Sequence, residues 1–390
     1  MLPMVATDKN TESTPAFPKS IFYKTENAYL EDYGMEEYVR EYEEVKSGKE
    51  CDVLWYMFLK KEILKKEKIQ SSDIRQILCA DPCFARIGLV FEQDQNARMK
   101  NQTEKRHGQC GWSPFEGGWD QRMRRLERSG NTYIEMDWTR YDGTIPNEVF
   151  KAIKNIRFSF LRKEYRTPEN RKVYDWYCNQ LVNRYVLMPS GEVTKQHCGN
   201  PSGQVSTTMD NNMCNTFLQA FEFMYTNGLD FEAAKAHWLS YDTLVYGDDR
   251  LTSTPLIPDD YAERVIDMYR TIFGMWVKEK NVKISSTLEG LSFCGFTNRE
   301  IRGKYMPVPA NVDKMLASLL TPCHKLPDIE ALHGKLLSYK IMFHNLPDED
   351  YGKQFIDLCL FSVEKHMRAR GGDPITFTTD VLNFLWRGGP

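Results

Sequence analysis

Apolar residues recur every three or four positions along the C-terminal part of the chain. This spacing places one apolar stripe along a helix, and it predicts helices at residues 315–320, 329–343, 351–367 and 381–386. The same spacing predicts a long helix from Met209 that ends at Gly228, with apolar positions at Met213, Phe217, Phe221 and Met224. Another capped helix is expected at residues 259–273, before Gly274.

Shorter apolar runs bounded by turn residues predict strands. Residues 132–138 form a strand that ends in an acid, and a helix is expected to follow, with a capping hydroxyl at Thr144, a first-turn proline and an early glutamate. Hairpins are expected at residues 184–194, 244–251 and 291–296. Helices and antiparallel strands therefore mix along the chain, and the expected fold class is α+β.

Composition sets the bounds on size and setting. With 390 residues, 41% of them hydrophobic, the chain can bury a large core and is expected to form two or three subdomains. No apolar run approaches the ~18 residues of a membrane span, and the polar start of the chain has no signal core, so we expect a soluble chain without a targeting segment. Ten cysteines without a CxxC pair favour reduced thiols. A net charge of −3 argues against a generally basic nucleic-acid coat, but it allows basic residues to line an acidic centre.

Two neighbouring acids, Asp248 and Asp249, follow Gly247 in the predicted hairpin at residues 244–251. A turn breaks the strand alternation, so both carboxylates can face one metal site. The plainer interpretation is a solvated hairpin tip. Asp137, at the end of the predicted strand 132–138, is a second candidate metal ligand, and Asp142 a candidate hydrogen-bond acceptor beyond it.

A loop of small residues opens the helix predicted from Met209. Ser202, Gly203, Thr207 and Asn211 lie at this junction, where a backbone can approach closely and side-chain hydroxyls and amides can bind a sugar. An ordinary capped helix is the alternative interpretation.

Basic residues are concentrated in two places. Residues 60–68 are rich in lysine, and a strand-like segment with Arg75 follows; this arrangement could hold cations over a phosphate channel or be a solvated face. A second cluster, Arg122, Arg124, Arg125 and Arg128, could contact a nucleic-acid backbone or be plain surface. The ligand types Cys79, Cys83, His107 and Cys110 could bind zinc, but their spacing is loose, so this is a weak hypothesis.

Taken together, the acidic and small-residue motifs resemble a known family. Asp-x4-Asp from Asp137, Ser-Gly-x3-Thr-x3-Asn from Ser202 and Tyr-Gly-Asp-Asp from Tyr246 are similar, in order and spacing, to palm motifs A, B and C of RNA-dependent RNA polymerases of positive-strand RNA viruses. The residues in and around these motifs are most similar to those of astrovirus polymerases. Further stretches resemble motif G at 11–18, motif F at 60–78, motif D at 259–283 and motif E at 291–296.

The resemblance implies a right-hand fold with fingers, palm and a helical thumb. It places fingers at 1–131 (motifs G and F), palm at 132–163 (motif A), a fingers insertion at 164–198, palm at 199–300 (motifs B to E) and thumb at 301–390. Because the family normally has a sizeable portion before motif G, which here begins within the first twenty residues, we expect the chain to be a partial polymerase.

The resemblance also implies roles for individual residues. Asp137, Asp248 and Asp249 would bind Mg²⁺, with Mn²⁺ as a possible substitute, and Lys283 or Lys280 would protonate pyrophosphate. The nucleotide would be bound by Lys65, Lys68, Arg75, Asp142, Ser202, Gly203, Thr207 and Asn211. Primer or template contacts are expected from Tyr246, Gly247, Arg250, Phe293 and Cys294.

Partners and alternatives complete the expectations. The family implies an RNA template and primer, nucleoside triphosphates, initiation from a small viral protein primer (VPg) together with other viral replication proteins, and host cytoplasm at membrane-associated replication complexes. Two alternatives are a reverse transcriptase, which usually has an aromatic gate in the place of Asp142, and a non-catalytic RNA-binding scaffold of replication complexes.

Overall fold

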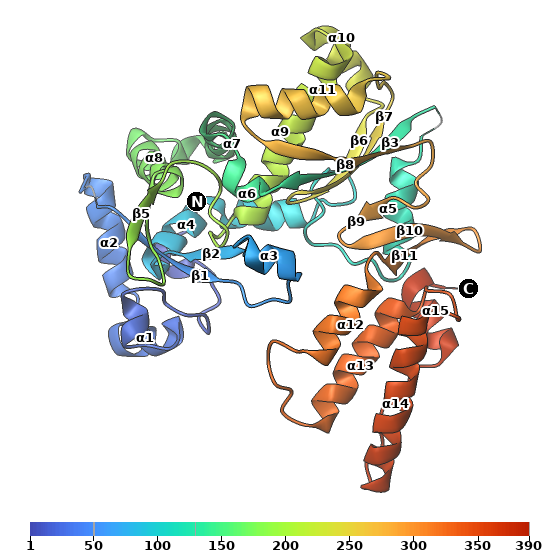
Figure 1. The fold of residues 1–390 in the computed structure, drawn as a ribbon. Coiled ribbons are helices and arrows are strands. Elements are labelled where there is room, and N and C mark those ends of the chain that lie inside the picture. Colours follow the sequence, from blue (N-terminus) through green and yellow to red (C-terminus); the bar gives the residue numbers. More distant parts are fainter. Residues whose placement is uncertain (50, 129, 390) are drawn as a thin grey trace.

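The fold is that of a right hand with three groups of elements. The computed structural model describes residues 1–49, 51–128 and 130–389. The fingers lie to the left in Figure 1, in blue and green, the palm lies at the upper right, and the thumb, in orange and red, lies below it. This arrangement leaves the edge of the palm sheet facing the fingers.

The fingers are built around a four-stranded sheet with the strand order β2-β1-β4-β5. β4 pairs with β1 in parallel, so the segment predicted as an insertion at 164–198 shares a sheet with the motif F region. The strands are β1 (Leu54–Leu59), β2 (Gln76–Cys79), β4 (Arg184–Leu187) and β5 (Val193–Gln196). The accompanying helices are η1 (Met4–Ala6), η2 (Lys19–Ile21), α1 (Glu26–Tyr33), α2 (Glu36–Ser47), α3 (Lys66–Gln70), α4 (Pro82–Lys100), η3 (Lys163–Tyr165) and α8 (Pro168–Val182).

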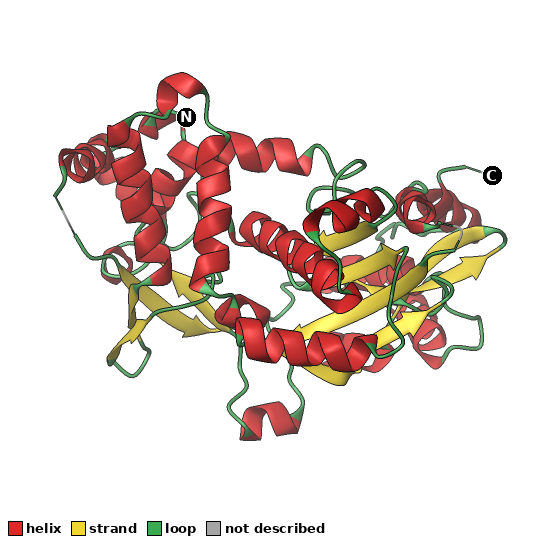
Figure 2. Ribbon diagram, turned by 90° about the horizontal axis from the view of Figure 1, so that it is seen from above, coloured by secondary structure: helices red, strands yellow, loops and turns green. Residues whose placement is uncertain are grey.

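The palm is an antiparallel sheet with the strand order β6-β7-β3-β8. Helices α9 and α11 cover one face of this sheet (Figure 2), and α5 with a small three-stranded sheet packs on the other. The strands are β3 (Thr132–Thr139), β6 (Asp242–Tyr246), β7 (Asp249–Thr254) and β8 (Trp276–Ser285), and the small sheet has β9 (Ser292–Phe293), β10 (Phe296–Ile301) and β11 (Lys304–Pro309). The helices are α5 (Gly118–Leu126), α6 (Tyr141–Thr144), α7 (Asn147–Ser159), α9 (Thr207–Asn227), α10 (Phe231–Trp238), α11 (Tyr261–Met268) and the π turn η4 (Tyr269–Phe273).

The thumb consists of four helices with their own apolar core. They are α12 (Val312–Leu320), α13 (Ile329–Phe343), α14 (Tyr351–Ala369) and α15 (Thr379–Arg387). Leu336, Phe343, Ile356 and Leu360 are buried at their centre. The periodicity of the sequence predicted these helices, and the structure confirms all four.

Two predicted subdomain boundaries and one helix cap differ from the structure. Helix α5 buries Trp119 and Met123 with palm residues, so the segment before residue 131 packs as palm and not as fingers. The boundary predicted at residue 301 falls within the β10–β11 hairpin, and the thumb helices begin at α12. Helix α7 has Pro146 at its N-cap without a side-chain hydrogen bond, because the Thr144 hydroxyl instead donates to the carbonyl oxygens of Arg140 and Tyr141.

Across the described ranges, no helix combines the length and the apolar character that crossing a bilayer requires.

Candidate active site

Asp137 lies on the central palm strand β3, beside a break in the ladder with β8. Met136 pairs with Val282 and Trp138 pairs with Val277, so four residues of β8 bulge opposite Asp137. A bulge interrupts pairing and redirects side chains at the end of a strand. The Asp137 side chain is exposed there, two positions along the same strand face from Glu135.

Asp248 and Asp249 lie at the tight turn between β6 and β7, where β7 is the direct neighbour of β3. Gly247 has φ of +67°, a conformation that favours glycine, and its amide donates to Asn212 Oδ1 at 2.7 Å. Asn215 Nδ2 donates to the Gly247 carbonyl at 2.9 Å. Helix α9 therefore holds the turn through both backbone polar groups of Gly247, the amide and the carbonyl.

The three acids affect one another electrostatically, although Asp137 is more than 100 residues from the other two. Partial burial and the charges of Asp248 and Asp137 raise the pKa of Asp249 to about 7. Partial desolvation and the charge of Asp248 also raise the pKa of Asp137. These shifts show that the protein gathers like charges at one end of the palm sheet.

The acids are near one another, but their side chains do not form a closed metal cage. Among residues 1–49, 51–128 and 130–389, no three His, Cys, Asp or Glu side chains form a group that could hold a metal ion by themselves. Mg²⁺ usually keeps several waters and combines one or two protein carboxylates with substrate phosphates. Exposed side chains of Asp137 and Asp248, beside the Asp249 carboxyl whose pKa is raised by burial and by like charge, suit such an open site.

The predicted sugar-binding residues meet in part. Asn211 Nδ2 donates to Asp142 Oδ1 at 2.7 Å, so motifs A and B are in contact. Burial and the charge of Asp248 raise the pKa of Asp142, and hydrogen bonds from Asn211 and Ser202 oppose this rise. The Thr207 hydroxyl donates to the Gln204 carbonyl at 2.9 Å and thus supports the loop in this conformation.

Gly203 also has a structural reason to be glycine. Its φ is +118°, and an added Cβ would lie 2.3 Å from the Leu78 carbonyl oxygen. Leu78 donates its backbone N–H to the Ser202 carbonyl at 2.8 Å. The motif B loop is therefore joined to strand β2 of the motif F region, which brings phosphate-binding and sugar-binding candidates to one place.

The predicted phosphate-binding cations lie over the acids. Lys68 belongs to α3, Lys65 directly precedes it, and Arg75 directly precedes β2. Burial and the neighbouring acids raise the pKa of Asp137, and the charges of Lys68 and Arg75 oppose this rise. Their side chains are more than half exposed, which leaves them open to a triphosphate.

The two candidate proton donors lie differently on β8. Lys283 pairs across the strands with Glu135, and its Nζ is 2.7 Å from Glu135 Oε1. Lys280 lies in the bulge opposite Asp137, and across the described part of the chain it forms no ion pair.

Two of the predicted primer or template residues, Arg250 and Phe293, are buried and are corrected by the structure, and two others, Gly247 and Cys294, have contacts inside the protein. Arg250 is 1% exposed and binds Glu222 through both terminal nitrogens, because it points to the strand face opposite Asp249. Phe293 is 2% exposed and belongs to the palm core, and Gly247 uses its backbone groups on α9. Tyr246 is 41% exposed and remains a candidate. Cys294 lies beside Asp249, and burial together with the charge of Asp249 raises the pKa of its thiol.

The zinc hypothesis is not supported within the described residues, and two of the four clustered arginines make contacts inside the protein, whereas for the exposed Arg124 and Arg128 a nucleic-acid contact stays a prediction. Cys83 is buried against the Tyr38 carbonyl, and His107 lies 3.9 Å from Asp242, so the candidate ligands do not converge within the described residues. Arg122 is buried, and Arg125 binds Asp242 through two nitrogens at 2.9 Å each. These arginines join the loop after α4 to strand β6.

Sequence patterns missed a buried polar stripe on α9. The residues share one helix face: Asn212 and Asn215 are hydrogen-bonded to the turn at Gly247, Gln219 and Glu222 to the palm strand β7, and the Thr226 hydroxyl to the Glu222 carbonyl of the same helix. The apolar stripe that predicted the helix is more exposed, with Phe217 at 40%. The polar spacing of three and four residues was the available signal, but such a stripe ordinarily marks a solvent face.

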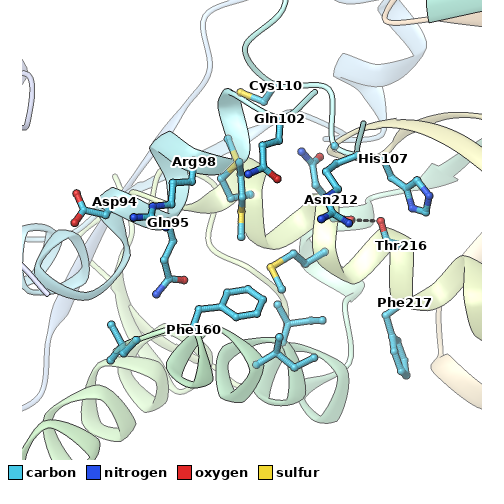
Figure 3. A pocket seen from close by; sticks show the side chains of 18 of the residues that line it. Asp94, Gln95, Arg98, Gln102, His107, Cys110, Phe160, Asn212, Thr216 and Phe217 are labelled. Atoms are coloured by element: carbon cyan, nitrogen blue, oxygen red, sulfur yellow. Dashed lines mark hydrogen bonds between the residues drawn. The ribbon is translucent and has the colours of Figure 1, made fainter. Parts of the chain in front are cut away.

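A cavity of about 1150 Å³ lies behind the catalytic turn, between α4, α7 and α9 (Figure 3). Asn212, which holds the Gly247 amide, lies on its wall, beside Thr216 and Phe217. The described residues that line it do not include the three acids. The cavity is therefore separate from the catalytic end of the sheet.

The fold and the site together define a right-hand template-directed polymerase: a palm sheet with one acid on its central strand, two on the neighbouring hairpin, and a small-residue loop joined to the fingers. The family model described as viral RNA-dependent RNA polymerase matches residues 12–359, and the chain belongs to this family.

Related sequences and structures agree with the family. The chain is 55% identical to non-structural polyprotein 1AB of Ovine astrovirus 1, over 99% of the chain and 29% of the polyprotein. It is 54% identical to that of Human astrovirus-1 (99% and 26%) and 49% identical to that of Turkey astrovirus 2 (93% and 22%). The chain thus spans less than a third of these relatives. The Sicinivirus 3Dpol RNA dependent RNA polymerase has the same fold, with a TM-score of 0.75 at 17% identity over 99% of this chain and 80% of that one.

Proposed function

We propose that this chain copies an RNA template by transferring nucleoside monophosphates to an RNA 3′-hydroxyl, with release of pyrophosphate, in viral genome replication and transcription. One observation carries the proposal: Asp137 and the pair Asp248 and Asp249 come from distant segments and affect one another at the end of one sheet. In a solvated hairpin tip, the two acids of the turn would not be expected to lie near a third acid from a distant segment.

Two Mg²⁺ ions are the proposed cofactor, with Mn²⁺ as a substitute. Asp137 and Asp248 would hold them, and Asp249 would assist once it has lost its proton. Bound divalent ions stabilise the attacking and leaving oxygens in phosphoryl transfer. The donor set consists of carboxylate oxygens only, which is the ligand type that Mg²⁺ and Mn²⁺ prefer.

The nucleotide would lie between the acids and the fingers. Lys65, Lys68 and Arg75 would bind the triphosphate, because two of them already act on the charge of Asp137. The ribose would be bound by Asp142 and Asn211, with Ser202, Gly203 and Thr207 shaping the loop beside it. A hydrogen bond to the 2′-hydroxyl distinguishes RNA from DNA precursors.

We assign proton donation to the leaving pyrophosphate to Lys283. It lies on the same strand face as Asp137, and its Nζ is held 2.7 Å from Glu135 Oε1 at the same end of the sheet. Lys280, in the bulge, is the alternative donor.

The proposed polymerase role also implies contacts with RNA and with partner proteins. Tyr246, exposed beside the turn, would contact the primer terminus, and the thumb would hold the product duplex. Initiation from VPg, other viral replication proteins, and a place in the host cytoplasm at membrane-associated complexes belong to the proposal through the relationship with polyproteins 1AB.

The direct test is incorporation of labelled nucleotides on a primed RNA template with Mg²⁺, by the chain and by an Asp248→Ala variant. The proposal expects product from the chain and background levels from the variant, with equal RNA binding. A chain that binds the template but makes no product with either cation would be the RNA-binding scaffold, and equal synthesis by both proteins would refute the metal assignment.

A further inference from the structure

Four charged side chains form a closed cluster beneath the motif B loop. Lys154 Nζ is 2.8 Å from Glu92 Oε1 and 2.7 Å from Asp210 Oδ2, and Arg157 Nη1 is 2.6 Å from Asp210 Oδ1. All four side chains are at most 2% exposed. Two cations balance two anions, as burial of charge requires. Burial would raise the pKa of Glu92, but the charges of Arg157 and Lys154 outweigh it and lower this pKa to about 2.

A chain of three amides leads from this cluster to the sugar-binding pair. Gln204 Nε2 donates to Asp210 Oδ2 at 2.7 Å and to Asn200 Oδ1 at 3.0 Å. Asn200 Nδ2 donates to Asn211 Oδ1 at 2.9 Å. Asn211 Nδ2 then donates to Asp142 Oδ1 at 2.7 Å. Gln204, Asn200 and Asn211 are each less than 10% exposed, so water does not compete freely for these bonds.

The chain of bonds has one direction. An ionised carboxylate only accepts hydrogen bonds, so the amide beside Asp210 must present its NH₂ group. The Gln204 oxygen accepts from the Ser206 amide at 2.7 Å, which fixes the same orientation. With Gln204 fixed, Asn200 must present its oxygen to Gln204 and its NH₂ to Asn211. The result is that Asn211 presents its NH₂ group to Asp142.

We propose that Asp210 and Gln204 are positioning residues that set the selectivity for ribonucleotides. They orient the Asn211 amide toward Asp142 before a nucleotide arrives, so the 2′-hydroxyl meets a preorganised acceptor and donor pair. This inference rests on the proposed function, in which Asp142 and Asn211 bind the ribose. Asp210 itself is completely buried and does not reach the nucleotide.

The test compares two Gln→Met substitutions that border the same ionic cluster. Gln204→Met removes the two hydrogen bonds that the Gln204 amide donates, one to Asp210 and one to Asn200. The matched control is Gln95→Met: Gln95 accepts from Arg157 Nε at 3.2 Å on the other side of the cluster, away from the amide chain. Steady-state incorporation of each NTP and its 2′-deoxy analogue on a primed RNA template gives kcat/KM for both sugars.

We expect Gln204→Met to lower the preference for NTP over dNTP about tenfold, chiefly through a higher KM for the NTP, which is the effect of one weakened buried hydrogen bond. Gln95→Met is expected to keep the wild-type preference. A merely structural role would lower incorporation of both sugars together. An unchanged preference in Gln204→Met, or an equal change in Gln95→Met, overturns the inference.

Two further variants keep the test decisive. Asn211→Ala in the same assay tests ribose binding itself: an unchanged preference there refutes the proposed function, whereas a changed one beside an unchanged Gln204→Met refutes only the positioning role. Thermal melting shows whether each variant is folded. If Gln204→Met does not fold, Asn200→Asp takes its place, since it keeps the shape of Asn200 and removes the NH₂ group that orients Asn211.

Discussion

The two halves of the active site differ in how far the protein builds them. At the proposed ribose site, Asp142 and Asn211 are already hydrogen-bonded and are continuous with a buried ionic cluster. At the proposed metal site, Asp137 and Asp248 are exposed, and the described side chains form no closed ligand group. The fold can hold neutral amides in their binding geometry before a nucleotide arrives. It cannot do the same for a group of carboxylates, because their charges repel one another until cations bind.

Removal of a metal carboxylate should have the largest effect. In Asp248→Asn, we expect the affinity for Mn²⁺ in the presence of nucleotide to fall more than about 100-fold, because a direct ligand contributes more than its supporting partners. Asn211→Ala serves as the control and is expected to bind Mn²⁺ normally. Titration calorimetry measures both, and equal losses in the two variants would show that the halves are not separate.

Replacing the proton donor comes next. Lys283→Leu is expected to slow single-turnover incorporation about 100-fold, within the range for general acids, with unchanged template binding. Lys280→Leu, on the same strand, is the matched control and should change the rate little. The opposite pattern would move the role to Lys280, and two unchanged rates would leave proton donation to water.

Acid should also weaken the ionic cluster beneath the ribose half. Because the pKa of Glu92 is about 2 in the folded protein against an ordinary 4.5, its stabilisation is present above pH 5 and is lost as the pH falls toward 2. The shift corresponds to about 3 kcal/mol. Urea unfolding of the cation-free protein at pH 7 and pH 4 should show a loss in the wild type that is smaller in Glu92→Gln. Parallel losses in both proteins would contradict the role of Glu92.

The smallest expected effect concerns the turn that presents Asp248. Asn212→Ala leaves the buried Gly247 amide without its acceptor, a cost of about 1–3 kcal/mol, and should lower kcat about tenfold. Asn227→Ala is the control, since Asn227 bonds only to Phe223 and Thr226 of the same helix. If both variants keep the wild-type kcat, α9 does not hold the turn in the working enzyme.

Much of this arrangement was open to prediction from the sequence. The helix from Thr207 to Asn227 and its end at Gly228 follow from periodicity and a glycine cap, and α13 has the predicted bounds. The positions of Asp137 and Asp248 followed from a strand end and a tight turn. Such local features depend on neighbouring residues alone, so they can be read directly from a sequence.

The rest depends on contacts between distant residues. Arg250 was predicted as an RNA contact from the family resemblance, yet strand alternation turns it toward Glu222, 28 residues upstream. No local pattern in the sequence marks Asp210 or Gln204. Only the packing of α4 and α7 against α9 shows that they are buried among charges, and no periodicity in the sequence contains that information.

The central claim, that the metal half drives the reaction while the ribose half selects the sugar, is tested most directly by one incorporation assay on a primed RNA template. Asp248→Asn and Asn211→Ala are each offered an NTP and its 2′-deoxy analogue with Mg²⁺. The predicted result is no product from Asp248→Asn with either sugar, and product from Asn211→Ala with both but a reduced preference for the NTP. Product from Asp248→Asn at wild-type rates, or a wild-type preference in Asn211→Ala, would contradict it.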